Sequence, residues 1–191
     1  MRPTMPALHA LAGAALILAA GVAPVAAQTP GELLRRDLEA GRAAVAVTTL
    51  RPLASSSMDA RMALGFAEFT HAVERLLQGL HRFGLKVPQN PFLPIVRLPV
   101  AENTRPEPVD YVKLRALYQA FLNDLATARA TLSSVAIHDG KILLDLTAIQ
   151  FNMVAGGDSG KRITLRDVIA SLGGGRSSGL EPWEVAFDRA D

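Results

Sequence analysis

Residues 56–85 constrain the fold more than any other stretch, because they carry one long amphipathic pattern. Apolar side chains recur at steps of three and four residues, which is the spacing of one face of an α-helix. They are Met62, Phe66, Phe69, Val73, Leu76, Leu77, Leu80 and Phe83. Ser56 and Asp59 stand at capping-box spacing. Gly84 followed by Leu85 is typical of a Schellman helix end. A helix of this length must bury its apolar face against other elements.

Residues 107–132 predict a second long helix. Its apolar face is formed by Leu114, Leu117, Tyr118, Phe121, Leu125, Ala128 and Leu132. Between the two helices, prolines at 88, 91, 94, 99, 106 and 108 exclude a helix through most of the segment. We expect this segment to cross the protein in an extended conformation. A polyproline motif that binds a partner is the alternative. The two helices should pack antiparallel, with Phe69 and Phe121 in a shared core.

The remaining predicted elements are short. Residues 32–40 and 42–53 predict two helices before the long one, and a strand is the alternative for the second. Residues 141–146 and 149–153 have strand patterns and could form a short β-hairpin. Residues 165–172 predict a helix that begins with a capping box between Thr164 and Asp167. The predicted fold class is therefore mainly α: antiparallel long amphipathic helices, a proline-rich extended crossover and the optional hairpin.

The N-terminus has the pattern of a secretory signal peptide. Arg2 precedes an apolar run over residues 11–20, which is too short to span a bilayer. Small residues before Gln28 suit cleavage after Ala27. An uncleaved anchor helix is the alternative. We expect a periplasmic or extracellular protein that has no membrane span once the signal peptide is removed.

The predicted domain organisation has three parts. Residues 1–27 are the signal peptide, residues 28–172 form a single helical domain, and residues 173–191 form a flexible glycine-rich linker and a tail. The tail alternates Trp183, Val185 and Phe187 with polar residues. Because exposed apolar clusters favour association, two alternatives stay open. Either the polypeptide is a truncated fragment of a longer one, or the tail docks on the core or on a partner.

Composition excludes several classes of function. The chain has no cysteine, so thiol catalysis, disulfides, a lipoprotein anchor and cysteine-based metal sites are excluded. It has 20 basic and 18 acidic residues and no basic run. Nucleic-acid binding proteins concentrate positive charge on one face, so we predict no nucleic-acid partner.

Four patterns are weak candidates for chemistry. Glu68 and His71 form one E-x-x-H pair, which a di-iron bundle would need twice; an exposed ion pair on the polar helix face is the favoured interpretation. The glycine turn before residue 163 places Asp158 and Asp167 at ligand positions of a degenerate EF-hand-like loop, where a plain turn and helix cap is favoured. His138 beside Asp139 predicts a solvated turn. Asp145 is expected to point outward.

Two resemblances add to this interpretation. Gly41, Ala46 and Leu50, followed by Leu64, Gly65 and Phe69, resemble the small and large positions of a tetratricopeptide-type helical hairpin, over about a quarter of the chain. The mature chain is also similar to a family of uncharacterised exported bacterial proteins. The residues that carry this likeness are 76–85, 97–100 and 124–132. The second resemblance implies an exported protein and no particular activity.

The leading functional hypothesis is an exported helical interaction or scaffold protein of the cell envelope, with a protein partner there. The first alternative is a calcium-binding module that uses the loop with Asp158 and Asp167. The second is an unrecognised hydrolase that combines His and Asp from separate segments. No nucleophile motif or metalloprotease motif is present. We therefore predict no catalytic residues, no cofactor and no cofactor-binding residues, and an enzyme is not favoured.

Overall fold

The computed structural model describes residues 28–85, 102–136, 140–154, 162–172 and 181–188. Four predicted features lie outside these ranges: the signal peptide up to Ala27, residues 86–101 of the proline-rich crossover, the glycine-rich turn with Asp158, and residues 173–180 of the glycine-rich linker. The pair His138–Asp139 also lies outside them.

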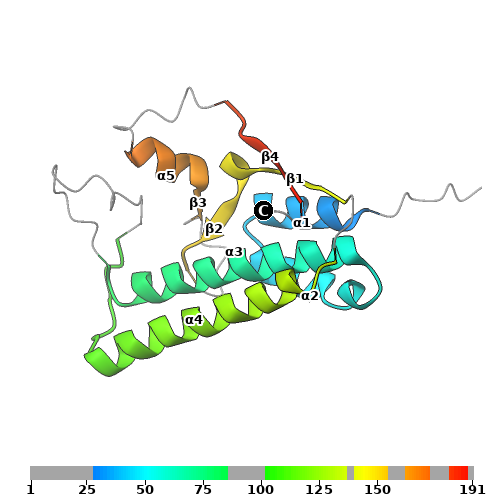
Figure 1. Cartoon of the computed structure of the whole chain (residues 1–191). Helices are drawn as coiled ribbons and strands as arrows, with labels where there is room; N and C mark the ends of the chain where they lie inside the picture. The colour runs from blue at the N-terminus through cyan, green and yellow to red at the C-terminus, as the bar shows by residue number, and fades with distance from the viewer. Residues whose placement is uncertain (1–27, 86–101, 137–139, 155–161, 173–180, 189–191) are drawn as a thin grey trace, which may run out of the picture.

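The described elements confirm a mainly α fold with short antiparallel strand pairs. In chain order they are α1 (Pro30–Glu39), α2 (Ala43–Leu50), the 3₁₀ turn η1 (Leu53–Ser55), α3 (Met58–Arg82), α4 (Tyr111–Ser133), β1 (Ile142–Asp145), the 3₁₀ turn η3 (Leu146–Ala148), β2 (Gln150–Asn152), β3 (Arg162–Thr164), α5 (Leu165–Leu172) and β4 (Glu184–Phe187). Figure 1 shows α3 at the centre, with α4 along one side and α1, α5 and the strands along the opposite side.

The long helix α3 begins one residue later than predicted. Its N-cap is Ser57, whose hydroxyl accepts a hydrogen bond from Ala60 N at 3.2 Å, and not Ser56. Its C-terminal end is a Schellman motif, as predicted. Gly84 has a φ of 74°, and the amides of Gly84 and Leu85 donate to the carbonyls of His81 and Leu80. Glycine suits this position because it has no Cβ.

The two long helices pack antiparallel, as predicted. Near one end Gly65 of α3 contacts Leu132 of α4, and near the other end Gly79 contacts Leu117. The predicted Phe69–Phe121 core is wrong for Phe69, whose side chain is 49% exposed. The main core lies on the side of α3 that faces away from α4, where Ala63 and Ala67 are buried, so Phe69 is left at the flank of the helix pair.

The main core is formed by α3 together with α1, α2 and β1. Its buried side chains include Leu34, Leu38, Leu50, Met62, Ile142 and Leu144. The helix α1 begins with a complete capping box formed by Thr29 and Glu32. The helical interpretation of residues 42–53 is confirmed by α2, although the α-helix ends at Leu50.

The strands pair in an order that the sequence pattern did not indicate. β1 pairs antiparallel with β4, and β2 pairs antiparallel with β3. Between β1 and β2 the chain makes the turn η3, and the two strands find separate partners. Of the alternatives for the tail, docking on the core is therefore observed for β4. Its Phe187 ring lies 4.7 Å from the ring of Phe66 on α3.

The capping box of α5 is present as predicted. The hydroxyl of Thr164 accepts from Asp167 N at 3.0 Å, and the Asp167 carboxylate accepts from Thr164 N at 2.8 Å. Throughout the described ranges, every helix is too short or too polar to cross a bilayer.

Candidate functional site

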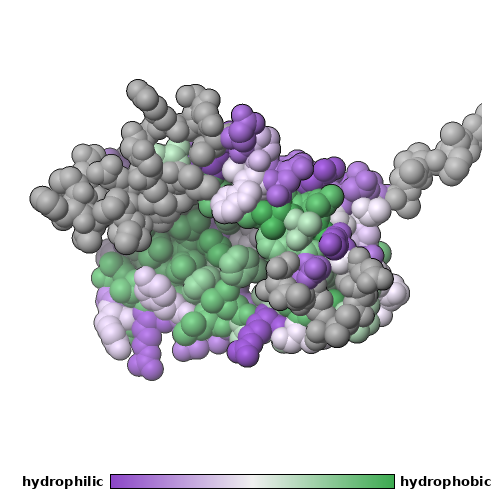
Figure 2. Space-filling view, turned by 45° about the horizontal axis from the view of Figure 1, so that its top comes forward, coloured by the Kyte–Doolittle hydropathy of each residue, from purple (hydrophilic) through white to green (hydrophobic). Residues whose placement is uncertain are grey.

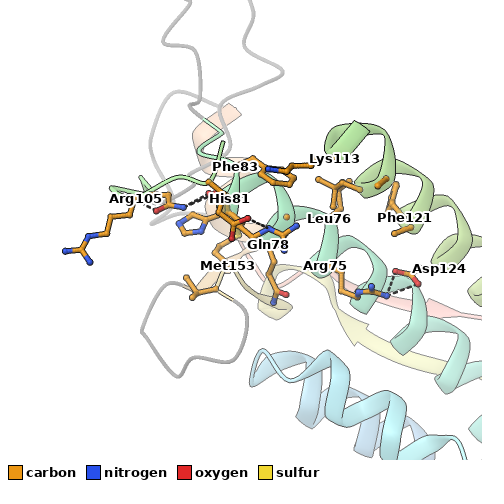
Figure 3. A pocket seen from close by; sticks show the side chains of 18 residues that line it. Arg75, Leu76, Gln78, His81, Phe83, Arg105, Lys113, Phe121, Asp124 and Met153 are labelled. Carbon is orange, nitrogen blue, oxygen red and sulfur yellow. Dashed lines mark hydrogen bonds and ion pairs between the residues drawn. The ribbon is translucent and has the colours of Figure 1, made fainter. Parts of the chain in front are cut away.

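A cleft of about 820 Å³ opens between the C-terminal half of α3 and the N-terminal half of α4 (Figure 3). We call it the α3–α4 cleft. Its main lining residues are Arg75, Leu76, Gln78, Gly79, Arg82, Phe83, Arg105, Glu107, Lys113, Leu117, Phe121, Asp124 and Met153. They come from both long helices, from the segment before α4, and from the residues that follow β2.

The floor of the cleft is apolar, and Gly79 sets its depth. A Cβ atom at position 79 would overlap the side chain of Leu117, so a larger residue there would force that side chain to move. Leu76 and Phe121 continue the apolar floor beside this contact. A glycine inside a helical pattern often marks such a close approach. This was the sequence signal, unused in the sequence analysis, that could have located the cleft.

One end of the cleft is closed by an ion pair between the two helices. Arg75 Nη1 donates to both carboxylate oxygens of Asp124, at 2.9 and 2.7 Å. Figure 3 shows these two side chains pointing toward each other across the helix pair. The Arg75 side chain is 51% exposed and that of Asp124 is 28% exposed, so solvent reaches the pair.

The other end is formed where α3 stops and the chain approaches α4. The side-chain nitrogen Nδ2 of Asn103 donates to the backbone carbonyls of His81 and Arg82, at 2.9 and 3.2 Å. Glu107 N donates to the Arg82 carbonyl at 3.0 Å. These bonds satisfy carbonyls that the end of a helix would otherwise leave without an intrahelical donor. They fix the segment with Arg105 and Glu107 against the cleft.

Two side chains of α3 hold the end of β2 at the wall of the cleft. Glu74 Oε2 accepts from Asn152 N at 3.0 Å, and Gln78 Nε2 donates to Asn152 O at 2.9 Å. Burial raises the pKa of Glu74, while the bond from Asn152 and the positive charge of Arg162 act in the opposite direction. The next residue, Met153, is buried and lines the cleft.

Positive charge exceeds negative charge around the cleft. Four of its lining residues carry positive side chains, namely Arg75, Arg82, Arg105 and Lys113, and two carry carboxylates, Glu107 and Asp124. Each carboxylate lies within 4 Å of an arginine, in the pairs Arg75–Asp124 and Arg82–Glu107. The Lys113 ammonium donates to the Pro108 carbonyl at 2.8 Å, while Figure 3 shows Arg105 extending away from the other labelled side chains. The surplus positive charge favours an acidic ligand group.

A second polar cluster on α3 corrects the E-x-x-H interpretation. Glu68 was expected on an exposed face, but it is 8% exposed. Its carboxylate accepts from Thr131 Oγ1 at 2.6 Å and from Arg51 Nη2 at 3.3 Å, so it joins α2, α3 and α4. His71 instead has its Nδ1 atom 3.9 Å from Glu74 Oε1. Burial lowers the pKa of His71, and the charge of Arg75 lowers it further against the opposing effect of Asp124.

This cluster does not assemble a nucleophile with a base. It surrounds a hollow of about 320 Å³ that includes His71, Asp124, Thr48 and Thr127. The hydroxyls of Thr48 and Thr127 donate to carbonyls one turn earlier in their own helices, at 3.0 and 3.1 Å. A nucleophilic hydroxyl would instead donate to the base. The hydrolase hypothesis therefore gains no support from this cluster.

Of the two candidate calcium ligands, Asp167 lies in the described ranges. Asp167 uses Oδ2 to accept from both the amide and the hydroxyl of Thr164, and Asp158 lies outside the described ranges. Within those ranges no group of three or more metal-ligating side chains occurs. Calcium binding through this loop stays a prediction.

Asp145 lies on the outward face of β1 with exposed Leu143, as expected, and it also has a structural role. Its Oδ1 atom accepts from Thr147 N, Thr147 Oγ1 and Trp183 N, at 2.9, 2.6 and 3.1 Å. Burial acts to raise the pKa of Asp145, but these hydrogen bonds and the charge of Arg166 together lower it. The carboxylate therefore joins β1 to the residue before β4.

At the predicted cleavage site, Gln28 is exposed, and its side-chain oxygen accepts from Arg36 at 2.7 Å. Neither Gln28 and Arg36 nor the polar groups around Glu68, His71 and Asp145 form a recognisable catalytic arrangement. The α3–α4 cleft is therefore the candidate site, with an apolar floor and a positively charged rim. Comparison of the chain with protein-family models, curated proteins and solved structures gave no match.

Proposed function

We propose that this protein is an exported helical interaction module of the cell envelope, and that the α3–α4 cleft binds a segment of a partner protein. The observation that carries the proposal is the composition of the cleft. Leu76, Leu117 and Phe121 offer an apolar floor between two helices, beneath a rim with surplus positive charge. Peptide segments are often bound by such grooves, in which apolar anchors supply affinity and charges on the rim supply orientation.

The chemistry of the cleft defines the segment that it would bind. The floor suits one or two aliphatic or aromatic side chains. Lys113 at the rim suits a carboxylate that follows or precedes them. The volume of about 820 Å³ lies within the range of pockets that hold small molecules as well. An acidic segment with an apolar anchor matches both the floor and the rim, whereas an uncharged apolar ligand would match the floor alone.

The location of the protein rests on the predicted signal peptide. Export followed by cleavage after Ala27 would leave Gln28 as the first residue of the mature chain. The intact mass of protein recovered from the periplasm tests this directly. A retained N-terminus would argue against release from the membrane and would replace the envelope module with an anchored one.

The absence of cysteine allows a site-specific test of the cleft. A single Ala116→Cys variant places one thiol at the lining of the cleft. A matched Gln119→Cys variant places one thiol at an exposed position of α4 that is absent from that lining. Each is coupled to a photoactivated cross-linker and added to an envelope extract. We expect a discrete cross-linked partner with Ala116→Cys only, competed by unlabelled wild-type protein.

Lys113→Glu in the Ala116→Cys background should remove that cross-link, because it reverses the charge of the rim. Lys113 is exposed, so the fold should be retained. Equal cross-linking from positions 116 and 119, or none from either, would contradict the proposal.

A further inference from the structure

A row of exposed apolar side chains runs along α4 on a flank that the cleft does not use. Tyr111 is 75% exposed, Leu122 56%, Tyr118 46% and Leu114 38%. Leu125 continues the row, and it lines a hollow together with Leu122, Ala126 and Arg129. The spacing of three and four residues keeps the row on one side of the helix. We call these residues, with Arg129, the α4 row.

The row borders the surface that packs on α3: Tyr111, Tyr118 and Leu122 lie beyond that surface, while Leu114 is in line with Leu132 along the helix. The contacts of α4 with α3 are made by Leu117, Asp124 and Leu132. Helical periodicity of 100° per residue places Tyr118 and Leu122 about a quarter to a third of a turn away from that surface. Figure 2 shows hydrophobic surface extending over the lower part of the molecule, where α3 and α4 lie. Within the described residues, this flank of α4 has no covering element.

We propose that the α4 row is an interface between two copies of this chain, which pack antiparallel along α4 about a twofold axis at the level of Ala120. The sequence of the row is self-complementary in this register. Position 118 then lies opposite position 122 of the second copy, so Tyr118 packs on Leu122. Position 111 lies opposite position 129. In a twofold interface each such contact occurs twice.

Charge supports a second copy as the occupant. Arg129 is exposed, and no ion pair holds it among the described residues. In the antiparallel register its guanidinium reaches Tyr111 and Asp110 of the second copy. An arginine over a tyrosine ring is a favourable cation–π contact, and Asp110 adds the opposite charge. Asp110 already caps α4 through Lys113 N at 2.8 Å, so its carboxylate is held at this end of the row.

The size of the row sets the expected strength. A fully covered tyrosine contributes roughly 150–250 Å² of buried surface, and the row has two tyrosines and three leucines along one helix. Because these side chains are already partly buried, the area left to cover falls below the roughly 800 Å² per partner of a stable standard interface. We therefore expect a weak dimer that forms at protein concentrations on the order of 10–100 μM, and a monomer at nanomolar concentration.

Cysteine cross-linking tests the register. Mature protein with Tyr118→Cys is mixed with mature protein with Leu122→Cys under mild oxidation. We expect the mixed 118–122 disulfide to form several times faster than a 119–123 disulfide from the matched pair Gln119→Cys and Asn123→Cys. Those two positions are exposed and lie about 100° round α4 from Tyr118 and Leu122, and their side chains hydrogen-bond to each other at 3.1 Å.

Sedimentation velocity over a concentration series tests the interface itself. Wild-type mature protein should show a monomer–dimer equilibrium, and Leu122→Glu should remain monomeric at every concentration with an unchanged circular dichroism spectrum. Gln119→Glu should dimerise as wild type does. Three results would each overturn the proposal: a wild-type protein that stays monomeric up to millimolar concentration, a Leu122→Glu protein that still dimerises, or equal rates for the two cysteine mixtures.

Discussion

The two long helices differ in burial although they are similar in length and in apolar pattern. α3 has buried residues from Ala60 to His81, while the only buried residue within α4 is Ala128. α3 has neighbours on both sides, with α1 and the strands on one side and α4 on the other (Figure 1). Among the described elements, α4 packs mainly on α3, and a hollow separates it from α2. An apolar stripe therefore shows that a helix has a face to cover, and its neighbours decide how much of that face is covered.

The largest loss of stability should come from shortening a buried side chain of α3. Met62 is 2% exposed, so Met62→Ala should lower the free energy of unfolding by roughly 2–5 kcal/mol. On α4, Val112 is 73% exposed, and Val112→Ala should change the free energy of unfolding by less than about 0.5 kcal/mol. Denaturant melts of the two variants measure the difference. Equal losses would mean that α4 is as deeply packed as α3.

The next effect concerns the carboxylate of α3 that ties β2 to the core. Glu74→Ala leaves Asn152 N without its acceptor and should cost on the order of 1–3 kcal/mol. Glu74→Gln keeps an oxygen acceptor and removes the charge. Comparing the two in denaturant separates the hydrogen bond from the charge. If both variants lose the same stability, the bond is not the main contribution.

The same carboxylate should give a characteristic pH dependence. Burial raises the pKa of Glu74 above its ordinary value of 4.5, so the folded state favours the protonated form. The stability from this group is full below pH 4.5 and is lost as pH rises through the folded pKa. Glu74→Gln is neutral at every pH. Its stability relative to wild type should therefore increase as pH rises from about 4 and then level off. A flat difference across this range would contradict the prediction.

The close approach of the two helices at Gly79 can be tested by a double-mutant cycle. Gly79→Ala adds a methyl group that overlaps Leu117, and overpacking costs roughly 1–3 kcal/mol. The gain in helix propensity returns about 1 kcal/mol, so we expect a net loss of about 1 kcal/mol. In a Leu117→Ala background the same change should become neutral or stabilising. Thermal melts of the four proteins decide this. Gly31→Ala, where a Cβ meets nothing within 4 Å, is the control and should not destabilise.

Local signals were predictable from the sequence, and tertiary neighbours were not. The Schellman end at Gly84 and the capping box of Thr164 and Asp167 depend on residues within five positions of each other, and both are present. Glu68 was assigned to the polar helix face among other charged residues, and Glu74 is a second buried carboxylate of the same helix. Their partners, Thr131 and Asn152, lie 63 and 78 residues away in the sequence. Only the fold brings such partners to them.

The same reasoning explains the candidate site. The sequence pattern suggested that α3 and α4 would pair, but the depth of the cleft depends on which residues meet at Gly79. It also depends on Asn103, which holds the segment before α4 against the end of α3 through bonds of 2.9 and 3.2 Å. Neither contact follows from periodicity. Phe69 failed as a core residue for a related reason, since a stripe that wraps part of a helix leaves its edge at the flank of the pair.

The smallest expected effect is that of the ion pair between the helices. Arg75 and Asp124 form a two-oxygen contact at 2.7 and 2.9 Å, but the arginine side chain is 51% exposed. Exposed pairs are screened by water and salt and contribute roughly 0.2–1 kcal/mol in double-mutant cycles. We expect the cycle of Arg75→Ala and Asp124→Ala to give a coupling within that range. It should shrink further when the salt concentration is raised from 0.1 to 1 M, because the screening length falls to about 3 Å.

A coupling above about 2 kcal/mol that persists in salt would mean that charge, and not the apolar contacts at Gly65 and Gly79, holds α4 in place. Removing the pair would then detach α4 from α3, and the Arg75→Ala variant would show faster amide hydrogen exchange along α4.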